Sequence, residues 1–309
     1  MRVTVTGATG LIGRPLLAAL RQRGAQLTVL SRDPERARDG LSESGLQSVQ
    51  TFGWEPAREP APAAALEGRD AVINLAGESV AQRWSPRAKR AIRESRVTGT
   101  RNLVEGLKSC EARPRTLVSA SAVGYYGHHG EEPLDEDAPP GRDFLAQVCA
   151  AWEAEAASAG PLGTRVVQVR TGVVLAAGGG ALASMLVPFR LGLGGPVAGG
   201  RQYMSWIQIG DHIALLLAAL EDERFAGPIN ATAPDPITNA EFSRALARAL
   251  HRPALVPVPA LALRLVFGEM ARVITTGARV LPARALMLGF KFRYPHAQEA
   301  LEHTLAEQR

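Results

Sequence analysis

The sequence predicts an α/β fold, in which a doubly wound parallel sheet is followed by a small C-terminal lobe. Short, nearly continuous apolar runs alternate with longer amphipathic segments, which is typical of parallel strands buried on both faces and joined by helices. A glycine-rich turn stands between the first strand and the first helix. The chain has 309 residues, of which 46% are hydrophobic, and this is enough for a full core.

Four strands are expected in the first quarter of the chain. Residues 2–6 alternate Val with Thr and predict a buried strand. Leu16, Leu17 and Leu20 then share one face of a helix, which is expected to end at Gly24. The further strands are predicted at residues 26–30, 46–52 and 70–75.

The alternation continues through the middle of the chain. Two helices are predicted, at residues 86–110 and 144–159, and two strands, at residues 116–120 and 165–175. Because strands joined by helices cross over with a right hand, these units give a doubly wound sheet.

The regular pattern ends near residue 176, where a Gly/Pro-rich stretch predicts loops around a ligand cleft. Helices return at 213–220 and 239–250, and Pro alternates with Val or Leu at 253–259, which predicts a linker. We therefore expect two parts. A core spans residues 1–235, with substrate loops from about residue 176, and a substrate-side module spans residues 250–305.

The basic net charge does not by itself indicate a nucleic-acid partner. The formal charge is +5, and because only Lys89, Lys108 and Lys291 are lysine, 35 − 3 = 32 of the basic residues are arginine. These arginines are spread along the chain among acidic residues, with no basic stripe interleaved with aromatic residues. We expect no nucleic-acid partner.

The sequence also predicts the compartment. No apolar run approaches the roughly 20 residues of a membrane-spanning helix, and a strand pattern starts at residue 2, where a signal peptide would need its apolar region. Cys110 and Cys149 form no disulfide framework and no zinc-ligand spacing. We expect a cytoplasmic protein without membrane contact, disulfide or metal, while its oligomeric state stays open.

The first glycine-rich turn predicts a dinucleotide site. Gly7, Gly10 and Gly13 are spaced three apart, directly after a strand and before a helix. Such glycines allow a tight turn, close approach of a pyrophosphate, and close packing of helix on strand. The free N–H groups of the helix N-terminus favour an anion, so Thr9, Leu11 and Ile12 join the predicted site. The alternative is a purely structural turn.

Ser31 and Arg32, at the end of the second strand, predict NADP(H) as the cofactor. An acidic residue there would bind an adenosine ribose hydroxyl, whereas Ser and Arg suit a 2′-phosphate. One arginine–phosphate hydrogen bond favours NADP over NAD by about ten- to hundredfold. Asp33 precedes Pro34 and is expected to cap a short helix over residues 34–38. The alternative for Arg32 is a solvated surface residue.

Small residues close the fourth strand. Asn74, Ala76 and Gly77 are expected at the carboxyl edge of the sheet, where they form a wall against the adenosine side of the dinucleotide. The alternative is a simple turn from strand to loop.

Several motifs together resemble the extended short-chain dehydrogenase/reductase superfamily with its Rossmann-type fold. They are residues 7–13, 74–77, 97–105 and 119–121. Other segments are similar to its atypical "epimerase family" branch, which carries a C-terminal module of unknown function. These are residues 77–78, 83–84, 121–127, 170–175, 188–195, 205–207, 252–253, 268–269 and 289–292. The resemblance covers nearly the whole chain, and implies that Glu78, Arg83, Trp84 and Arg190 lie in the cleft.

The resemblance implies a catalytic Tyr with a Lys four residues later, and this pair is missing. If Glu153 is aligned with the trailing Glu of the family pattern, Leu145 and Cys149 take the places of Tyr and Lys. Neither residue can transfer a proton at neutral pH. Ser121 stands where the superfamily has its catalytic Ser, and Tyr125 and Tyr126 are the nearby phenols that could replace the acid. The alternative is that both tyrosines pack the loop.

The histidines form no metal-ligand spacing. His128 and His129 lie in a polar loop, and His212 follows Asp211 at a helix start, so we expect solvated loop and helix-cap roles.

The predicted function is an NADP(H)-dependent oxidoreductase or epimerase-like activity on a small hydroxyl or carbonyl substrate. One alternative is an NADPH-binding sensor that has lost catalysis with the Tyr-Lys pair. Another is a nucleotide-sugar epimerase, which would need a proton acceptor opposite the nicotinamide.

Overall fold

The computed structural model describes residues 1–43, 45–46, 48–254 and 256–307. The predicted strand over 46–52 and the predicted linker over 253–259 each include one residue outside these ranges.

A seven-stranded sheet forms the centre of the molecule, in the order β11-β7-β5-β4-β1-β2-β3, and every neighbouring pair in it is parallel. The strands are β1 (Arg2–Thr6), β2 (Gln26–Ser31), β3 (Gln50–Gly53), β4 (Ala71–Asn74), β5 (Thr116–Ala122), β7 (Arg165–Thr171) and β11 (Gly227–Ala231).

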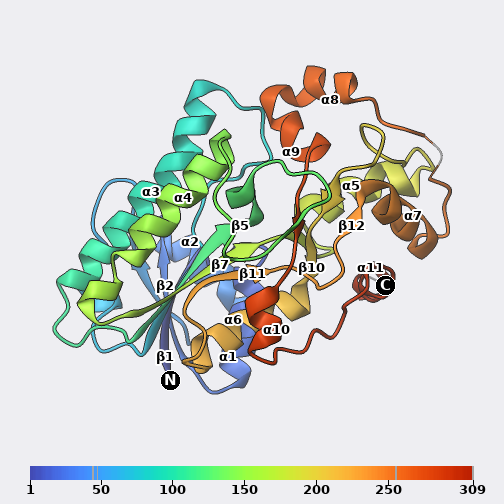
Figure 1. The fold of residues 1–309 in the computed structure, drawn as a ribbon. Helices are drawn as coiled ribbons and strands as arrows, with labels where there is room; N and C mark the ends of the chain where they lie inside the picture. Colours follow the sequence, from blue (N-terminus) through green and yellow to red (C-terminus); the bar gives the residue numbers. More distant parts are fainter. Residues whose placement is uncertain (44, 47, 255, 308–309) are drawn as a thin grey trace.

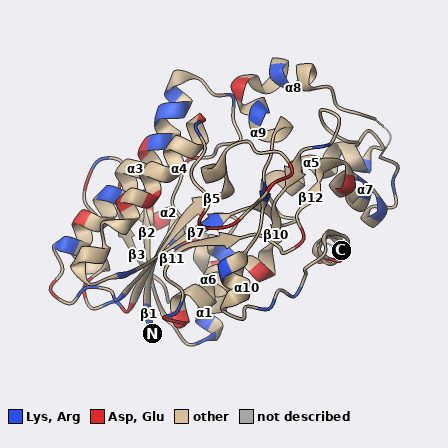
Figure 2. Ribbon diagram, viewed as in Figure 1, with Lys and Arg blue, Asp and Glu red and all other residues tan. Residues whose placement is uncertain are grey.

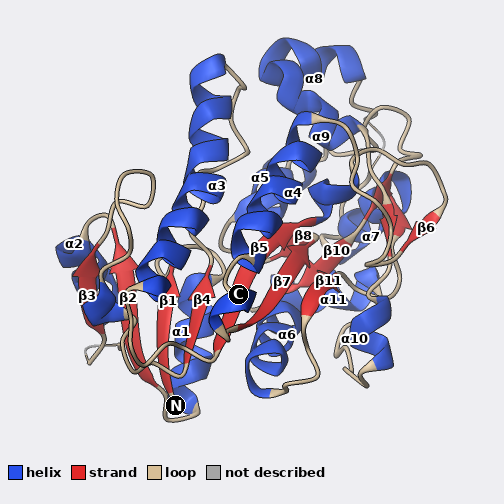
Figure 3. Ribbon diagram, turned by 60° about the vertical axis from the view of Figure 1, so that its left-hand side comes forward, coloured by secondary structure: helices blue, strands red, loops and turns tan. Residues whose placement is uncertain are grey.

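Helices cover both faces of this sheet (Figures 1 and 3). On one face lie α3 (Pro86–Lys108) and α4 (Phe144–Ala157), and on the other α1 (Gly13–Gln22) and α6 (Ile209–Glu221). The alternation along the strands explains the two layers. Val3 and Val5 pack with α1 and α6, whereas Val72 and Leu117 pack with α3 and α4. The predicted doubly wound Rossmann-type fold is confirmed.

Two predicted strands have different limits in the structure. The strand expected at 46–52 is shorter and shifted, because β3 spans Gln50–Gly53. The strand expected at 165–175 is broken at Gly172 into β7 and β8 (Val173–Leu175). A Cβ atom at Gly172 would lie 2.5 Å from the carbonyl oxygen of Ser205. This close approach turns the chain out of the main sheet, and β8 pairs instead with β10 (Trp206–Gln208).

The remaining elements belong to the connections between these strands or follow the last of them, β11, in the sequence. They are α2 (Pro34–Ser42), β6 (Pro133–Leu134), α5 (Gly180–Arg190), β9 (Tyr203–Met204), β12 (Ile237–Thr238), α7 (Asn239–Ala249), α8 (Ala260–Phe267), α9 (Ala271–Thr275), β13 (Arg279–Val280), α10 (Ala283–Met287) and α11 (Ala297–Ala306). The C-terminal segment contacts the core at several points. β13 pairs with β6, and α11 packs on α7 in a separate apolar cluster.

Two surface properties bear on the partners of the protein. Among the described residues, no helix is long and apolar enough to span a bilayer. Basic and acidic residues are interspersed along α3 (Figure 2).

Candidate functional site

The glycine-rich loop after β1 is packed against the loop after β4. Gly7 has a φ of +66°, and a Cβ atom there would lie 2.7 Å from the carbonyl carbon of Leu75. A Cβ atom at Gly13 would overlap the carbonyl oxygen of Gly7. The amide of Gly10 closes the turn by donating to the same carbonyl oxygen at 3.1 Å. Gly7 and Gly13 are therefore required for the approach of helix, loop and sheet edge.

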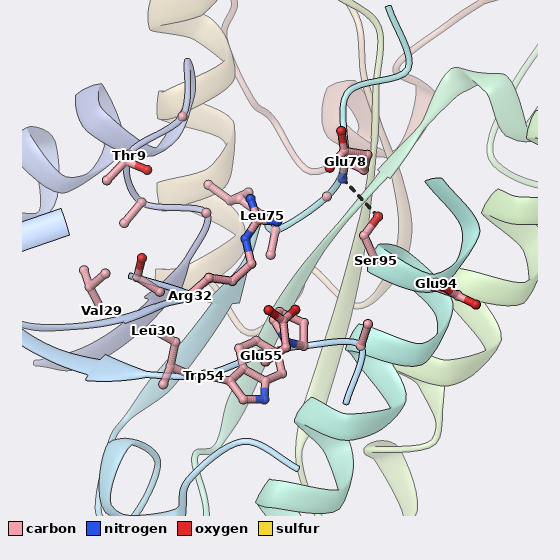
Figure 4. Close-up of a pocket in the computed structure, with 18 of the residues that line it drawn as sticks. Thr9, Val29, Leu30, Arg32, Trp54, Glu55, Leu75, Glu78, Glu94 and Ser95 are labelled. Atoms are coloured by element: carbon pink, nitrogen blue, oxygen red, sulfur yellow. Dashed lines mark hydrogen bonds between the residues drawn. The ribbon is translucent and has the colours of Figure 1, made fainter. Parts of the chain in front are cut away.

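A cavity of about 400 Å³ opens above this loop (Figure 4). The ends of β1, β2 and β4, the loop after β3 and one face of α3 form its walls. Of the predicted cofactor residues, the cavity brings together Gly7, Thr9, Gly10, Ser31, Arg32, Ala76 and Gly77. Its lining also includes residues that the sequence did not single out as site residues, among them Trp54, Glu55, Glu94 and Ser95. In the sequence, the only feature that could have pointed to these residues as part of the cavity is their position after β3 or on α3.

Arg32 directly follows β2. Its side chain is exposed and extends into the cavity (Figure 4). In the described part of the chain its guanidinium has no hydrogen-bond or ion-pair partner. The neighbouring polar groups are engaged elsewhere. The Ser31 hydroxyl accepts from the amide of Asp33 at 3.2 Å, and the Asp33 carboxylate accepts from the amide of Arg36 at 3.0 Å. The predicted cap is thus confirmed, although α2 extends beyond residue 38 to Ser42.

The other four predicted cofactor residues lie outside the cavity lining. Ile12 is the N-cap of α1 and makes no side-chain cap hydrogen bond, and Gly13 starts the helix. Leu11 packs against the start of α5, where a Cβ atom at Gly180 would lie 2.9 Å from its Cδ2. Leu11 therefore joins the glycine-rich loop to the predicted substrate loops.

Asn74 is buried and acts through its neighbours. Its Oδ1 accepts from the Thr6 hydroxyl at 2.7 Å, and its Nδ2 donates to the Thr100 hydroxyl at 3.0 Å. The Thr6 hydroxyl in turn accepts from the amides of Leu75 and Ala76. Asn74 thereby fixes the conformation of the loop that forms the cavity wall.

Ser121 lies near the end of β5 and is buried against α4. Its hydroxyl donates to Oε1 of Glu153 at 2.6 Å. Arg170, on the neighbouring strand β7, donates to both carboxylate oxygens of Glu153 at 2.8 Å. Because the hydroxyl proton is directed to Glu153, Ser121 retains its lone pairs for another partner.

The two candidate tyrosines have different environments. Tyr126 is fully buried, and its hydroxyl accepts from Nη1 of Arg170 at 2.9 Å and donates to Asn230 at 2.7 Å. Burial raises the pKa of Tyr126 to about 12. Tyr125 is half-buried, with Cζ of Arg170 3.5 Å from its ring centroid. Among the described residues, the Tyr125 hydroxyl has no hydrogen-bond partner.

The positions aligned with the missing Tyr-Lys pair face the loop after β5. A Cβ atom at Gly124 would lie 3.4 Å from Cβ of Leu145 and 3.9 Å from Sγ of Cys149. Burial raises the pKa of the Cys149 thiol to about 12. Cys149 is therefore a neutral thiol at physiological pH.

The expectation for His212 is wrong. Its side chain is buried on α6, with Nε2 3.0 Å from the Thr171 hydroxyl and Nδ1 without a partner in the described structure. Gln208, rather than Asp211 or His212, is the N-cap of α6, and its side chain accepts from the amide of Gly210. The helix starts four residues before the predicted limit of 213, which turns His212 toward β7. No group of metal-ligating side chains occurs in the described ranges.

The glycine-rich loop, the parallel strand order and the cavity at the carboxyl edge define an extended short-chain dehydrogenase/reductase fold. The chain belongs to the NAD dependent epimerase/dehydratase family, whose model matches residues 3–231. A second model, a domain of unknown function (DUF1731), matches residues 258–304. The resemblance to the epimerase family branch is thereby confirmed.

Relatives of similar length carry the same family name. The chain is 41% identical over 306 residues to the chloroplastic epimerase family protein SDR39U1 homolog of Arabidopsis thaliana, covering 97% of this chain and 86% of that protein. It is 40% identical to the mouse epimerase family protein SDR39U1, covering 99% and 100%. A crystal structure of the human protein SDR39U1 (isoform 2) with NADPH has a TM-score of 0.86 and 35% identity, and covers 99% of both chains.

Proposed function

We propose that the protein is an NADP(H)-dependent oxidoreductase or epimerase-like enzyme that acts on a small hydroxyl or carbonyl substrate. The observation that carries the proposal is the unpaired guanidinium of Arg32, which shares one cavity with the glycine-rich loop. An exposed arginine in this place suits the 2′-phosphate of NADP(H). The human relative crystallised with NADPH supports the same cofactor.

Different residues are proposed to bind the 2′-phosphate, the adenosine and the pyrophosphate of the cofactor. Arg32 holds the 2′-phosphate, and Ser31 joins it when its hydroxyl turns away from the carbonyl oxygen of Asp33, to which it donates at 3.0 Å. Ala76 and Gly77, held in place by Asn74, form the wall beside the adenosine. The loop of Gly7, Thr9, Gly10, Leu11, Ile12 and Gly13 holds the pyrophosphate through backbone N–H groups. The loop fits this group, because Gly7, Thr9 and Gly10 line the cavity and no long side chain at the glycines keeps a pyrophosphate away from the backbone.

The proposed catalytic residues act beside the nicotinamide, which supplies or accepts a hydride when bound. Ser121 orients the substrate oxygen, and since its proton is directed to Glu153, it does so by accepting a hydrogen bond from a substrate hydroxyl. Tyr125 is the better candidate for the proton donor, because its hydroxyl is free of other partners. Tyr126 supports the site by holding Arg170 and Asn230.

An NADPH-binding sensor remains the second candidate function. Leu145 and Cys149 favour it, because they replace the pair that would transfer the proton. Substrate-dependent oxidation of NADPH separates the two candidates, since a sensor binds NADPH without turnover.

For either function we propose a cytoplasmic location and no nucleic-acid partner. The two buried thiols, which form no disulfide, support a reducing compartment.

A thermal-unfolding titration with NADPH, NADP⁺, NADH and NAD⁺ tests the cofactor assignment. A ligand at a hundred times its Kd stabilises the folded protein by about 2.7 kcal/mol, so we expect the phosphorylated forms to raise Tm at lower concentrations. Arg32→Ala should weaken NADPH about ten- to hundredfold and leave NADH unchanged. Arg244→Ala, an exposed arginine on α7, is the control. Equal losses for both cofactors in Arg32→Ala would refute the phosphate contact, and no stabilisation of the unaltered protein by any cofactor would refute the proposed function.

A further inference from the structure

Arg96 is a second cation near the cofactor cavity, although it is not one of the residues that line it. It lies on α3 directly after Ser95, which lines the cavity and accepts from the amide of Glu78 at 2.9 Å (Figure 4). Arg96 extends beneath the loop after β4, where a Cβ atom at Gly77 would lie 3.1 Å from its Cζ. Gly77 thus separates Arg96 from the adenosine side of the site.

The guanidinium of Arg96 is held in position but lacks a counter-ion. Its Nη1 donates to the carbonyl oxygens of Glu78 at 2.9 Å and Ile92 at 3.3 Å. Its Cζ lies 5.3 Å from the ring centroid of Trp152 on α4. Within the described ranges, Nε and Nη2 have no acceptor, and no carboxylate forms an ion pair with this side chain.

Arg96 is half-buried, and a charge in such a place is ordinarily paired with an anion or with acceptor oxygens. Burial lowers the pKa of Arg96, and the nearby carboxylate of Glu78 acts in the opposite direction. The side chain remains charged in any case, because guanidinium groups stay protonated in proteins. Its free N–H donors therefore suit a ligand with acceptor oxygens.

The surroundings of Arg96 point to the nicotinamide half of the dinucleotide. Arg96 lies over the ring of Trp152, and Trp152 follows Cys149 by three residues on α4, where Cys149 stands at the aligned position of the missing lysine. Trp152, beneath the guanidinium, donates to Thr100, the same hydroxyl that binds Asn74 at the end of β4. The cation therefore lies between the end of β4 and α4, on the side of Gly77 that faces away from the adenosine cavity.

We propose that Arg96 binds the nicotinamide-ribose half of NADP(H), through the oxygen atoms of its ribose and phosphate, and so replaces the missing lysine with a cation from a different helix. This assignment rests on the proposed cofactor site. It does not require that the protein be an enzyme, because a sensor would hold the cofactor in the same way.

Binding of two probes to single variants tests the proposal. Isothermal titration compares NADPH with adenosine 2′,5′-bisphosphate, which carries the adenosine half and its phosphate but no nicotinamide ribose. Arg96→Met keeps the length and apolar contact of the side chain on Trp152 and removes the charge. We expect it to weaken NADPH about tenfold or more and to leave the bisphosphate within about twofold. Arg96→Lys should recover part of the NADPH affinity.

Arg93→Met is the control, because Arg93 is an exposed arginine one turn away on the same helix. Unchanged NADPH affinity in Arg96→Met would overturn the inference. Parallel loss of both probes would also overturn it, because Arg96 would then only fix the loop at Gly77 and Glu78. If the unaltered protein bound neither probe, the proposed cofactor site itself would fail, and that result is distinguishable from the other two.

Discussion

At the scale of single residues, the distance between α1 and the edge of the sheet depends on glycines. Gly7 adopts a positive φ and touches the loop after β4, and Gly13 contacts the carbonyl of Gly7. A side chain at either position would have to displace backbone atoms, which cannot move as a flexible side chain can. The geometry of the cofactor loop is therefore sensitive to one methyl group.

Gly13→Ala should destabilise the protein by about 1–3 kcal/mol and weaken NADPH, because the new Cβ atom overlaps the Gly7 carbonyl. Gly160→Ala is a matched control, since a Cβ atom there meets nothing within 4 Å. Urea unfolding and an NADPH titration of both variants measure the two effects. Wild-type behaviour of Gly13→Ala would show that the loop can relax.

Some residues of the site can be predicted from the sequence, whereas others become apparent only in the structure. The glycines at 7, 10 and 13 could be predicted because their requirement is local to one turn. The partnership of Glu153 with Ser121 and Arg170 could not be predicted, because it depends on which faces of α4, β5 and β7 meet in space. The same holds for Arg96, whose role follows from Gly77 and Trp152 rather than from its sequence neighbours.

At the scale of elements, α6 shows how a helix start decides the environment of a side chain. Its N-cap is Gln208, so the first turn already contains Asp211 and His212, and both are buried. The apolar run at 213–220 predicted the helix but not its polar first turn, because buried polar residues give no hydrophobic period. The break at Gly172 was missed for a related reason, since it depends on contact with Ser205.

The burial of His212 makes the stability of the protein pH-dependent. Burial lowers the pKa of His212 from an ordinary value near 6.5 to about 4. The unfolded chain therefore binds a proton between pH 6.5 and 4 that the folded protein does not, and stability falls as the pH falls through this window. The full effect is about 3 kcal/mol, at 1.36 kcal/mol for each pKa unit.

His212→Gln should remove this contribution while keeping a polar group near Thr171. Chemical unfolding of both proteins at pH 7 and pH 4.5 gives the comparison, in which the unaltered protein should lose more stability than the variant. An equal loss in both would show that His212 is protonated in the folded state or has little effect on unfolding.

At the scale of the whole molecule, the C-terminal segment is fastened to the core by polar contacts as well as by packing. The buried carboxylate of Asp211 accepts from the amides of Arg293 and Tyr294, both at 2.9 Å. The Ser205 hydroxyl donates to the carbonyl of Ala278 and accepts from the amide of Val280. The sequence predicts a C-terminal substrate-side module over residues 250–305. It does not predict these particular contacts, because they join residues 82 and 83 positions apart.

Asp211→Asn should loosen this attachment, because an amide side chain provides one acceptor oxygen where the carboxylate provides two. We expect a loss of about 1–3 kcal/mol and faster proteolysis near residues 288–296. Asp222→Asn is the control, as this aspartate lies at the other end of α6 and pairs with the exposed Arg224. Limited proteolysis followed by mass spectrometry locates the cleavage sites, and identical digestion of the two variants would show that packing alone holds the segment.

The burial of both thiols has a practical consequence for spectroscopy. Cys110 and Cys149 are 1% and 4% exposed, and burial raises the pKa of each. Alkylating reagents react with cysteine only when an exposed thiolate attacks them. Both native cysteines are therefore slow to react in the folded protein. Two cysteines introduced at exposed positions, one in the core and one in the C-terminal segment, become the preferred attachment points for fluorophores or spin labels. The distance between the two parts is then measurable without first removing the native thiols.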